Sequence, residues 1–345
     1  MALYLGKDLV SAFSGSGGTT IKNQDITVTE NGTYTADSGY TGLGTVTVDV
    51  PTGGGDVKLV DWVSGTLEEV AEGDIAGATT IREYGFYKCT SLKKMTIPES
   101  VTSLGAYAFG ECSNLEEIHF NAIAMSDLAN NNNIFYKTGN SGNGIKVVIS
   151  KKVTRIPAYL LNPYGTSSSY SPKVTSVEFE EGSVCSIIGR NAFNYLINIT
   201  SVNIPNSVTK IDNYAFKDCS ALAQITIPNS VIEIGDSAFI RTGLTSVVIP
   251  DGVTTILNSC FQNCTSLTSV TFNGSIAKIN SRAFNGCTAM KTYDFTHCTS
   301  VPILSDKDAF TYIPSDCQIR VPASLYDEWI AATNWSNYAS YIVAV

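Results

Sequence analysis

Histidine, a residue often used in catalysis and metal binding, is almost absent from this 345-residue chain, which contains only His119 and His297. Neither residue belongs to a His-Glu-x-x-His motif or to another paired spacing typical of zinc ligands. No combination of acid, base and nucleophile is visible elsewhere in the sequence. We therefore expect a non-enzymatic protein with no catalytic residue, no metal site and no cofactor.

Long apolar runs and clusters of basic residues are also missing. No stretch of about 18 apolar residues occurs, so no membrane-spanning helix is expected. The chain has 22 Lys and Arg residues against 31 Asp and Glu residues, whereas nucleic acids and anionic membranes attract concentrated positive charge. We expect no nucleic-acid partner and no membrane insertion. Residues 1–8 have neither a basic start nor a long apolar stretch, so they do not predict a secretory signal.

An internal repeat is the most prominent feature that is present. Each copy has a β-branched residue five positions before the Phe of an Ala-Phe pair, as in Ile211–Phe216, Ile234–Phe239 and Ile279–Phe284. Aligned on the aromatic position, the copies fall at Phe86, Phe109, Phe135, Leu161, Phe193, Phe216, Phe239, Phe261, Phe284 and Phe310. Their usual spacing of about 23 residues lies in the roughly 20–29 residue range of leucine-rich solenoids, whose coils bury their apolar faces only by stacking.

A short alternating segment predicts a strand within each coil. In Leu267–Phe272, the apolar residues Val270 and Phe272 alternate with Thr271, which is the pattern of a half-buried strand. Several of these segments end in Pro, which cannot donate a ladder hydrogen bond and therefore favours a turn. The Phe of each copy is expected to fill an inward corner. The sequence predicts a leucine-rich-repeat solenoid of about ten coils of ~23 residues with short parallel strands.

The repeated phrases resemble a known family. Residues Cys219–Val231, with the sequence Cys-Ser-Ala-Leu-Ala-Gln-Ile-Thr-Ile-Pro-Asn-Ser-Val, resemble the BspA-like leucine-rich repeats of bacterial surface proteins. The likeness covers roughly residues 75–345: Val153–Leu161 is similar to a variant coil of the family, and Val321–Trp329 is similar to its C-terminal cap. The resemblance implies a protein-binding or adhesive solenoid.

The nine cysteines follow the repeat rather than a metal or disulfide framework, since no Cys-x-x-Cys motif occurs and the number is odd. Two occupy other recurring inward positions, Cys185 and Cys260, and five lie three residues after the repeat aromatic: Cys89, Cys112, Cys219, Cys264 and Cys287. We expect buried, reduced thiols that behave as small hydrophobic residues. The alternative is a disulfide between neighbouring coils, Cys89 with Cys112 or Cys264 with Cys287, because strands roughly 4.8 Å apart permit a bridge.

The first 56 residues do not follow the repeat. Gly-rich and Ser-rich residues 15–20 and 53–55 favour flexible connections, while Ile26–Thr29 and Val46–Val50 alternate as strands, with a turn at Asn31-Gly32. We predict an N-terminal segment 1–20, a small β module 21–56, the solenoid 57–320 and a C-terminal cap 321–345. The β module resembles short modules of tail-associated phage and prophage proteins of gut bacteria, which implies release by lysis without a secretory signal.

The C-terminal segment is expected to close the solenoid with a helical cap. Asp316–Pro322 predicts the last strand, and Ser324 followed by Asp327 indicates the start of a helix with an acidic first turn. Three apolar residues are expected to cover the end of the last coil: Leu325, Trp329 and Trp335.

Two surfaces are candidates for binding. The outward face of the strands is polar and weakly charged, and its candidate residues are His119, Asn203, Thr226 and Thr271. Two insertions, residues 138–144 and 162–172, follow the same repeat position in adjacent coils and must emerge on one edge. Their Tyr, Ser, Gly and Asn content is that of antibody-type binding loops; the candidate residues are Asn140, Asn143, Tyr164, Ser168 and Tyr170. Solvated strand positions and ordinary loop composition are the alternative interpretation.

Binding is the function class that these features favour: a non-enzymatic protein that recognises a protein or glycan at a bacterial or phage surface. The alternative is a structural phage tail or virion component in which the solenoid is a spacer. A hydrolase with an unrecognised site is a third interpretation, which the missing acid, base and nucleophile disfavour. We expect an extracellular, cell-surface or virion location.

Overall fold

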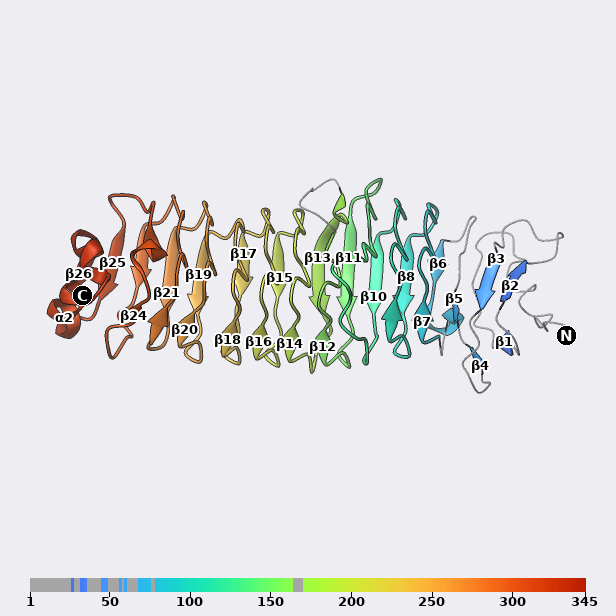
Figure 1. Ribbon diagram of the computed structural model, residues 1–345, viewed down its shortest axis with the longest axis horizontal. Coiled ribbons are helices and arrows are strands. Elements are labelled where there is room, and N and C mark those ends of the chain that lie inside the picture. Colours follow the sequence, from blue (N-terminus) through green and yellow to red (C-terminus); the bar gives the residue numbers. More distant parts are fainter. Residues whose placement is uncertain are drawn as a thin grey trace. The chain divides into compact units, whose positions relative to one another are not determined.

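The chain folds into a parallel-strand β-solenoid of about 12 turns with a short C-terminal helical segment, so the predicted fold class is confirmed (Figure 1). The computed structural model describes residues 68–75, 78–163 and 170–345, and the backbone of five short strands between residues 26 and 60. The chain divides into two compact units. The first unit comprises Met1–Val153 and Leu161–Glu180, and the second comprises Thr154–Leu160 and Glu181–Val345.

The first unit carries two parallel sheets, one of longer and one of shorter strands. The longer strands pair in the order β6 (Glu69–Val70), β8 (Lys94–Ile97), β10 (Glu117–Phe120), β11 (Ile145–Ile149) and β13 (Val174–Phe179). The shorter strands pair in the order β5 (Leu59–Val60), β7 (Thr80–Ile81) and β9 (Ser103–Leu104). A 3₁₀ helix, Glu72–Ile75, follows β6. Strands of successive coils pair in parallel, so equivalent residues of neighbouring coils lie side by side.

The second unit repeats this arrangement with shorter strands. One set of longer strands pairs β15 (Ser201–Asn203) with β17 (Gln224–Thr226), and another has the order β19 (Ser246–Ile249), β21 (Ser269–Phe272), β23 (Thr292–Asp294), β25 (Gln318–Val321) and β26 (Ile342–Ala344). The two-residue strands form two ladders: β12 (Arg155–Ile156), β14 (Ile187–Ile188), β16 (Lys210–Ile211) and β18 (Glu233–Ile234), and then β20 (Thr255–Ile256), β22 (Lys278–Ile279) and β24 (Ile303–Leu304).

The four described strands before the solenoid are antiparallel and pair among themselves. β1 (Ile26–Thr27) pairs with β4 (Asp56–Val57), and β2 (Gly32–Thr35) pairs with β3 (Thr45–Val48). In contrast, β5 pairs in parallel with β7 and so belongs to the solenoid. The change of pairing falls between Val57 and Leu59, close to the predicted boundary after residue 56. The division into four segments stays a prediction.

Stacked phenylalanine rings form the centre of each unit. The repeat aromatic of each coil is buried and lies 5.2–5.4 Å, centroid to centroid, from the next one along the stack. The stack contains Phe86, Phe109 and Phe135 in the first unit, and Phe193, Phe216, Phe239, Phe261, Phe284 and Phe310 in the second. Aromatic pairs at this distance stabilise a core by roughly 0.5–1.5 kcal/mol beyond their burial.

The backbone at the phenylalanine corner joins neighbouring coils. The N–H groups of Tyr214, Phe216 and Asp218 donate to carbonyl oxygens of the next coil at 2.8–3.0 Å, while the N–H groups between them close turns within their own coil. Tyr214 and Asp218 have φ values of 59° and 61°, a left-handed conformation that costs non-glycine residues roughly 1–2 kcal/mol each. Because equivalent residues of most coils share this conformation, it belongs to the architecture and does not mark a site.

The buried cysteines donate hydrogen bonds as well as filling apolar space. All nine cysteines are buried and carry free thiols, so their predicted burial is confirmed. Four thiols donate to the carbonyl oxygen of the repeat aromatic in the preceding coil, at S···O distances of 2.9–3.3 Å: Cys112, Cys219, Cys264 and Cys287. The hydroxyl of Thr138 makes the equivalent bond to Phe109 at 2.8 Å. Burial raises the pKa values of the Cys185 and Cys264 thiols to about 11.

The C-terminal segment closes the second unit, with two corrections to its predicted details. α2 (Tyr326–Ala331) follows a 3₁₀ helix, Ala323–Leu325, and no side chain caps it, so Ser324 is not its N-cap. β25 is not the last strand, because β26 pairs with it in parallel after the 3₁₀ helix Trp335–Tyr341. A further 3₁₀ helix, Lys307–Phe310, contains the last repeat aromatic.

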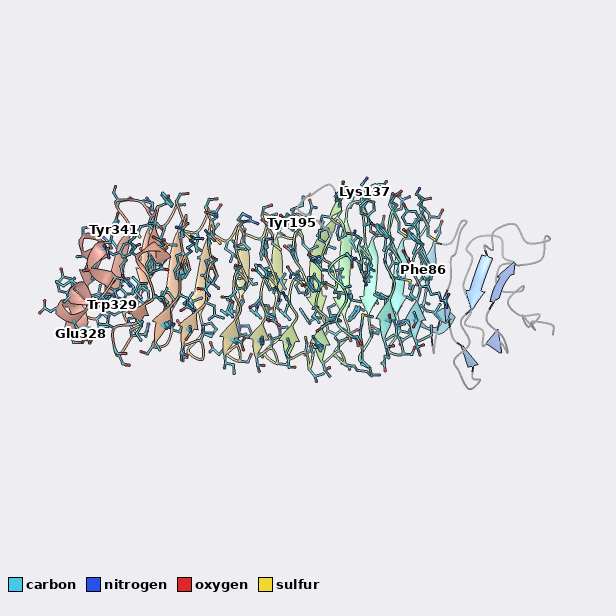
Figure 2. All side chains as sticks on the ribbon, viewed as in Figure 1. Phe86, Lys137, Tyr195, Glu328, Trp329 and Tyr341 are labelled. Carbon is cyan, nitrogen blue, oxygen red and sulfur yellow. The ribbon has the colours of Figure 1, made fainter. Side chains whose placement is uncertain are left out.

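Trp329 and Trp335 cover the end of the aromatic stack, as predicted, and both are fully buried. Figure 2 shows Trp329 at the C-terminal end of the second unit. The ring centroid of Trp329 lies 5.4 Å from that of Phe295, and the ring centroid of Trp335 lies 5.4 Å from that of Phe310. The indole N–H of Trp335 donates to the carbonyl oxygen of Pro302 at 2.7 Å. Leu325 is only half-buried. The two indoles therefore supply most of the cover that the sequence predicted from three residues.

The aromatic stack predicts unequal costs for two truncations in the second unit. Phe239→Ala should reduce the free energy of unfolding by about 3–5 kcal/mol, because it leaves a cavity between Phe216 and Phe261. Thr226→Ala should cost less than about 1 kcal/mol, because Thr226 is exposed on β17. Chemical denaturation of both variants measures the difference. Equal losses would contradict the inward placement of the repeat aromatic.

The buried thiols should be slow to react in the folded protein, because the thiolate is the reactive form and burial raises the thiol pKa values. We expect negligible alkylation of the native chain at neutral pH, and nine modified cysteines after unfolding without reductant. Intact-mass spectrometry counts the modifications. Fewer than nine in the unfolded chain would show that a disulfide had formed.

Candidate functional site

Where the structure describes both insertions, they lie beside each other on one edge of the first unit, as their common repeat position predicted. The backbone N–H of Lys137 donates to the carbonyl oxygen of Tyr170 at 3.2 Å, and the N–H of Lys173 donates to that of Thr138 at 2.9 Å. The Lys173 ammonium also donates to the carbonyl oxygen of Gly142 at 2.8 Å. In each of these three hydrogen bonds, a residue of one insertion bonds to the residue that directly flanks the other insertion.

Three of the five insertion residues predicted as binding candidates are described by the structure. Asn140 and Asn143 are exposed, and Tyr170 is 39% exposed. Tyr164 and Ser168 lie outside the described residues. The insertion edge therefore presents two amide side chains and one aromatic ring whose positions are known.

A row of tyrosines continues from the insertions across neighbouring coils, and sequence analysis missed it. The tyrosine row consists of Tyr84, Tyr87, Tyr107, Tyr136 and Tyr170, all half-buried or exposed. Consecutive rings are in contact, with centroid distances of 5.2–5.5 Å for four neighbouring pairs: Tyr84–Tyr87, Tyr84–Tyr107, Tyr107–Tyr136 and Tyr136–Tyr170. The rings form a continuous surface made from sequence positions up to 86 residues apart, counted from Tyr84 to Tyr170.

Two lysines and one glutamate accompany the tyrosine row. The Lys88 ammonium lies 5.1 Å from the centroid of the Tyr87 ring, and Lys137 lies 5.1 Å from that of Tyr136 and 5.9 Å from that of Tyr170. Lysines at this distance interact favourably with the negative face of an aromatic ring. Figure 2 shows Lys137 at the margin of the first unit, where the turns between strands lie.

Glu111 is held within the row. Its carboxylate accepts a hydrogen bond from the Tyr87 hydroxyl at 3.0 Å, and a carboxylate oxygen lies 3.7 Å from the Lys88 ammonium. Partial burial, together with the hydrogen bond to Glu111, raises the pKa of Tyr87 to about 12. Tyr87 therefore stays protonated and remains a donor at physiological pH.

The tyrosine row has a signal in the sequence. Tyr84 and Tyr107 both stand two residues before a repeat aromatic, while Tyr87 and Tyr136 both stand one residue after one. In the structure these positions flank the buried corner, so they point outward where Phe points inward. Alignment of all columns of the repeat, rather than of the buried ones alone, would have shown that tyrosine recurs at these two positions in neighbouring coils.

His119 does lie on the outward side of β10, as predicted, but it is not a free recognition residue. Its Nε2 atom contacts the carboxylate of Glu117 two residues earlier on the same strand. The same carboxylate lies 3.5 Å from the Lys94 ammonium on the adjacent strand β8. The hydrogen bond from His119 and the nearby charge of Lys94 lower the pKa of Glu117. The side chain of His119 is therefore engaged by its own strand.

The other strand-face candidates lie in the second unit and are not all neighbours. Asn203 on β15 and Thr226 on β17 are directly paired and exposed. Thr271 lies on β21, in a different set of strands, where Val248 and Asp294 are its register partners. The structure thus brings Asn203 and Thr226 together but places Thr271 in a separate ladder.

Two negative observations apply to the described part of the chain. No three His, Cys, Asp or Glu side chains there converge in an arrangement that could hold a metal ion. No helix within the same residues has the length and hydropathy needed to cross a membrane.

Residues 77–180 and 186–315 match the family model described as BspA type Leucine rich repeat region, in six copies. These two segments cover more than half of the chain. No curated protein matches the sequence significantly.

Solved structures of bacterial leucine-rich repeat proteins are similar to this chain. A leucine rich cell surface protein from Faecalibacterium prausnitzii has 19% identity and a TM-score of 0.35, with 99% of this chain and 96% of that chain covered. A leucine-rich repeat protein from Bacteroides ovatus has 17% identity, a TM-score of 0.36, and coverage of 78% and 88%. The pneumococcal vaccine antigen PcpA has 16% identity, a TM-score of 0.35, and coverage of 80% and 76%.

The contact between Glu111 and Tyr87 can be tested by titration. Glu111→Gln should lower the pKa of Tyr87 from about 12 towards the ordinary tyrosine value near 10, because the variant removes a negative charge and a strong acceptor. Burial remains, so the return should be partial. NMR chemical shifts of selectively labelled tyrosine, followed against pH, report the value. An unchanged pKa would show that Glu111 does not contact this hydroxyl in solution.

Proposed function

Since the chain belongs to the BspA type leucine-rich repeat family, we propose that it is a non-enzymatic binding protein that attaches to a protein or glycan at a bacterial surface through the tyrosine row. The observation that carries this proposal is the continuous contact of five outward tyrosines beside two hydrogen-bonded insertions. An extracellular or cell-surface location follows from the same proposal.

The tyrosine row has the properties of a preorganised interface. Tyrosine gives a large contact area for the loss of few rotamers, and it is enriched among the residues that dominate binding energy. Here each ring is already held by its neighbours and by the turns that carry it. Little side-chain freedom is left to lose when a partner binds, so a larger share of the contact energy contributes to affinity.

The strand face of the first unit is a weaker candidate, because its charges neutralise one another. Lys94 pairs with Glu117, and Lys146 pairs with Glu178 at 2.7 Å, in each case between neighbouring strands. A partner that bound there would have to replace these pairs with contacts of its own. In the tyrosine row, the described ion pair is that of Lys88 with Glu111, at one end, while Lys137 at the other end contacts rings only.

Removal of the two rings at the insertion end of the row tests the proposal. Tyr136→Ala with Tyr170→Ala should weaken attachment, because buried tyrosine anchors contribute about 2 kcal/mol or more each to many interfaces. Fluorescently labelled protein would be measured on fixed bacterial cells, fixed epithelial cells and immobilised mucin. Thermal unfolding of the variant verifies that the fold persists, since neither residue belongs to the buried stack.

The matched control is Thr226→Ala with Thr271→Ala, which alters the strand face of the second unit and should leave attachment unchanged. If only the control variant loses attachment, binding belongs to the strand face and the proposed site is wrong. If neither variant changes attachment, the solenoid is better described as a spacer in a larger assembly, which is the structural alternative.

A further inference from the structure

Lys137 is a half-buried cation without a carboxylate partner among the described residues. Among the described residues, its ammonium lies within ion-pair distance of no acidic group, and its recorded contacts are the rings of Tyr136 and Tyr170. Most of the other lysines that the structure describes in the first unit have an acidic partner, as Lys88, Lys93 and Lys94 do. The positive charge of Lys137 is therefore oriented by two rings and is not neutralised locally.

The hydroxyl groups near Lys137 add further donors. Among the described residues, the hydroxyls of Tyr136 and Tyr170 have no hydrogen-bond partner, whereas that of Tyr107 accepts from the Asn133 amide at 3.2 Å. The carboxylate of Glu111, which lies within the row, is already engaged by Tyr87 and Lys88. The surface around Lys137 thus offers an ammonium group and two hydroxyl groups as donors.

The arrangement of the rings argues against a sugar as the main partner. Stacking of a sugar requires an open aromatic face, but Tyr84 and Tyr107 are stacked on each other with an interplanar angle of 6°. Lysine ammonium groups lie over the rings of Tyr87, Tyr136 and Tyr170. These contacts occupy one face of each of these rings, which leaves fewer open faces on which a sugar could stack.

From this geometry we infer that the tyrosine row binds an acidic protein segment, with carboxylates of the partner accepting from the Lys137 ammonium and from the hydroxyls of Tyr136 and Tyr170. The inference rests on the proposed function and names its partner class. The net charge of the chain is −9, so an acidic segment would be repelled by the protein in general. A locally positive, donor-rich surface would therefore select the position at which such a segment binds.

A random peptide library displayed on filamentous phage, selected on the immobilised full chain, tests this inference. Enriched peptides should contain more Asp and Glu than the unselected library. Synthetic copies of these peptides, measured by fluorescence anisotropy, should bind Lys137→Gln at least about fivefold more weakly than the native chain. Lys137→Arg should retain binding, and added salt should weaken it, because the contact is between charges.

Lys278→Gln is the matched control, since Lys278 is an exposed lysine on β22 in the second unit and should not affect peptide binding. Peptides that lack an acidic excess, but lose binding in the Tyr136→Ala variant, would overturn the acidic partner and leave the proposed site intact. If no peptide depends on Lys137, while oligogalacturonate binds and is lost in Lys137→Gln, the partner is an acidic glycan and the inference is wrong. Failure of every probe to bind at the row also overturns it.

Discussion

The stacking of one phenylalanine on the next is the contact on which both units depend. Each ring is buried about 5.3 Å from its neighbour, as between Phe216 and Phe239, and the backbone around it donates hydrogen bonds to the following coil. A single coil has no interior of its own, so these contacts exist only between coils. The left-handed residues at each corner carry a conformational cost that this repeated packing must offset.

The same packing leaves the outward columns free to differ between coils. Positions two before and one after the aromatic hold four tyrosines in the first unit, Tyr84, Tyr87, Tyr107 and Tyr136, yet they hold Ser237 and Ile240 in one coil of the second. All are carried by the same turn, with positive φ at Ser237 as at Tyr84. The same backbone can therefore carry very different side chains from coil to coil. A recognition surface on a solenoid is formed by equivalent positions of several successive coils rather than by single residues.

The strand face and the tyrosine row of the first unit also differ in how their charges are paired. On the strand face of the first unit, lysines and glutamates of adjacent strands neutralise one another, and His119 is held by Glu117. In the tyrosine row, Lys88 and Glu111 are paired, but Lys137 lies over aromatic rings instead of beside a carboxylate. A lysine that is already held over aromatic rings loses little side-chain freedom when it binds an anion. Its positive charge remains available for that contact.

The sequence alone determined the repeat, its register, the inward phenylalanines, the burial of the cysteines and the shared edge of the two insertions. Each of these follows from periodicity, because equivalent positions of stacked coils must share an environment. Only the tertiary structure decided that β26 adds a strand after the expected end, that Cys112 donates to a backbone carbonyl, and that five tyrosines meet in one row. These features depend on side-chain direction and on contacts between distant residues, which the period of the pattern does not encode.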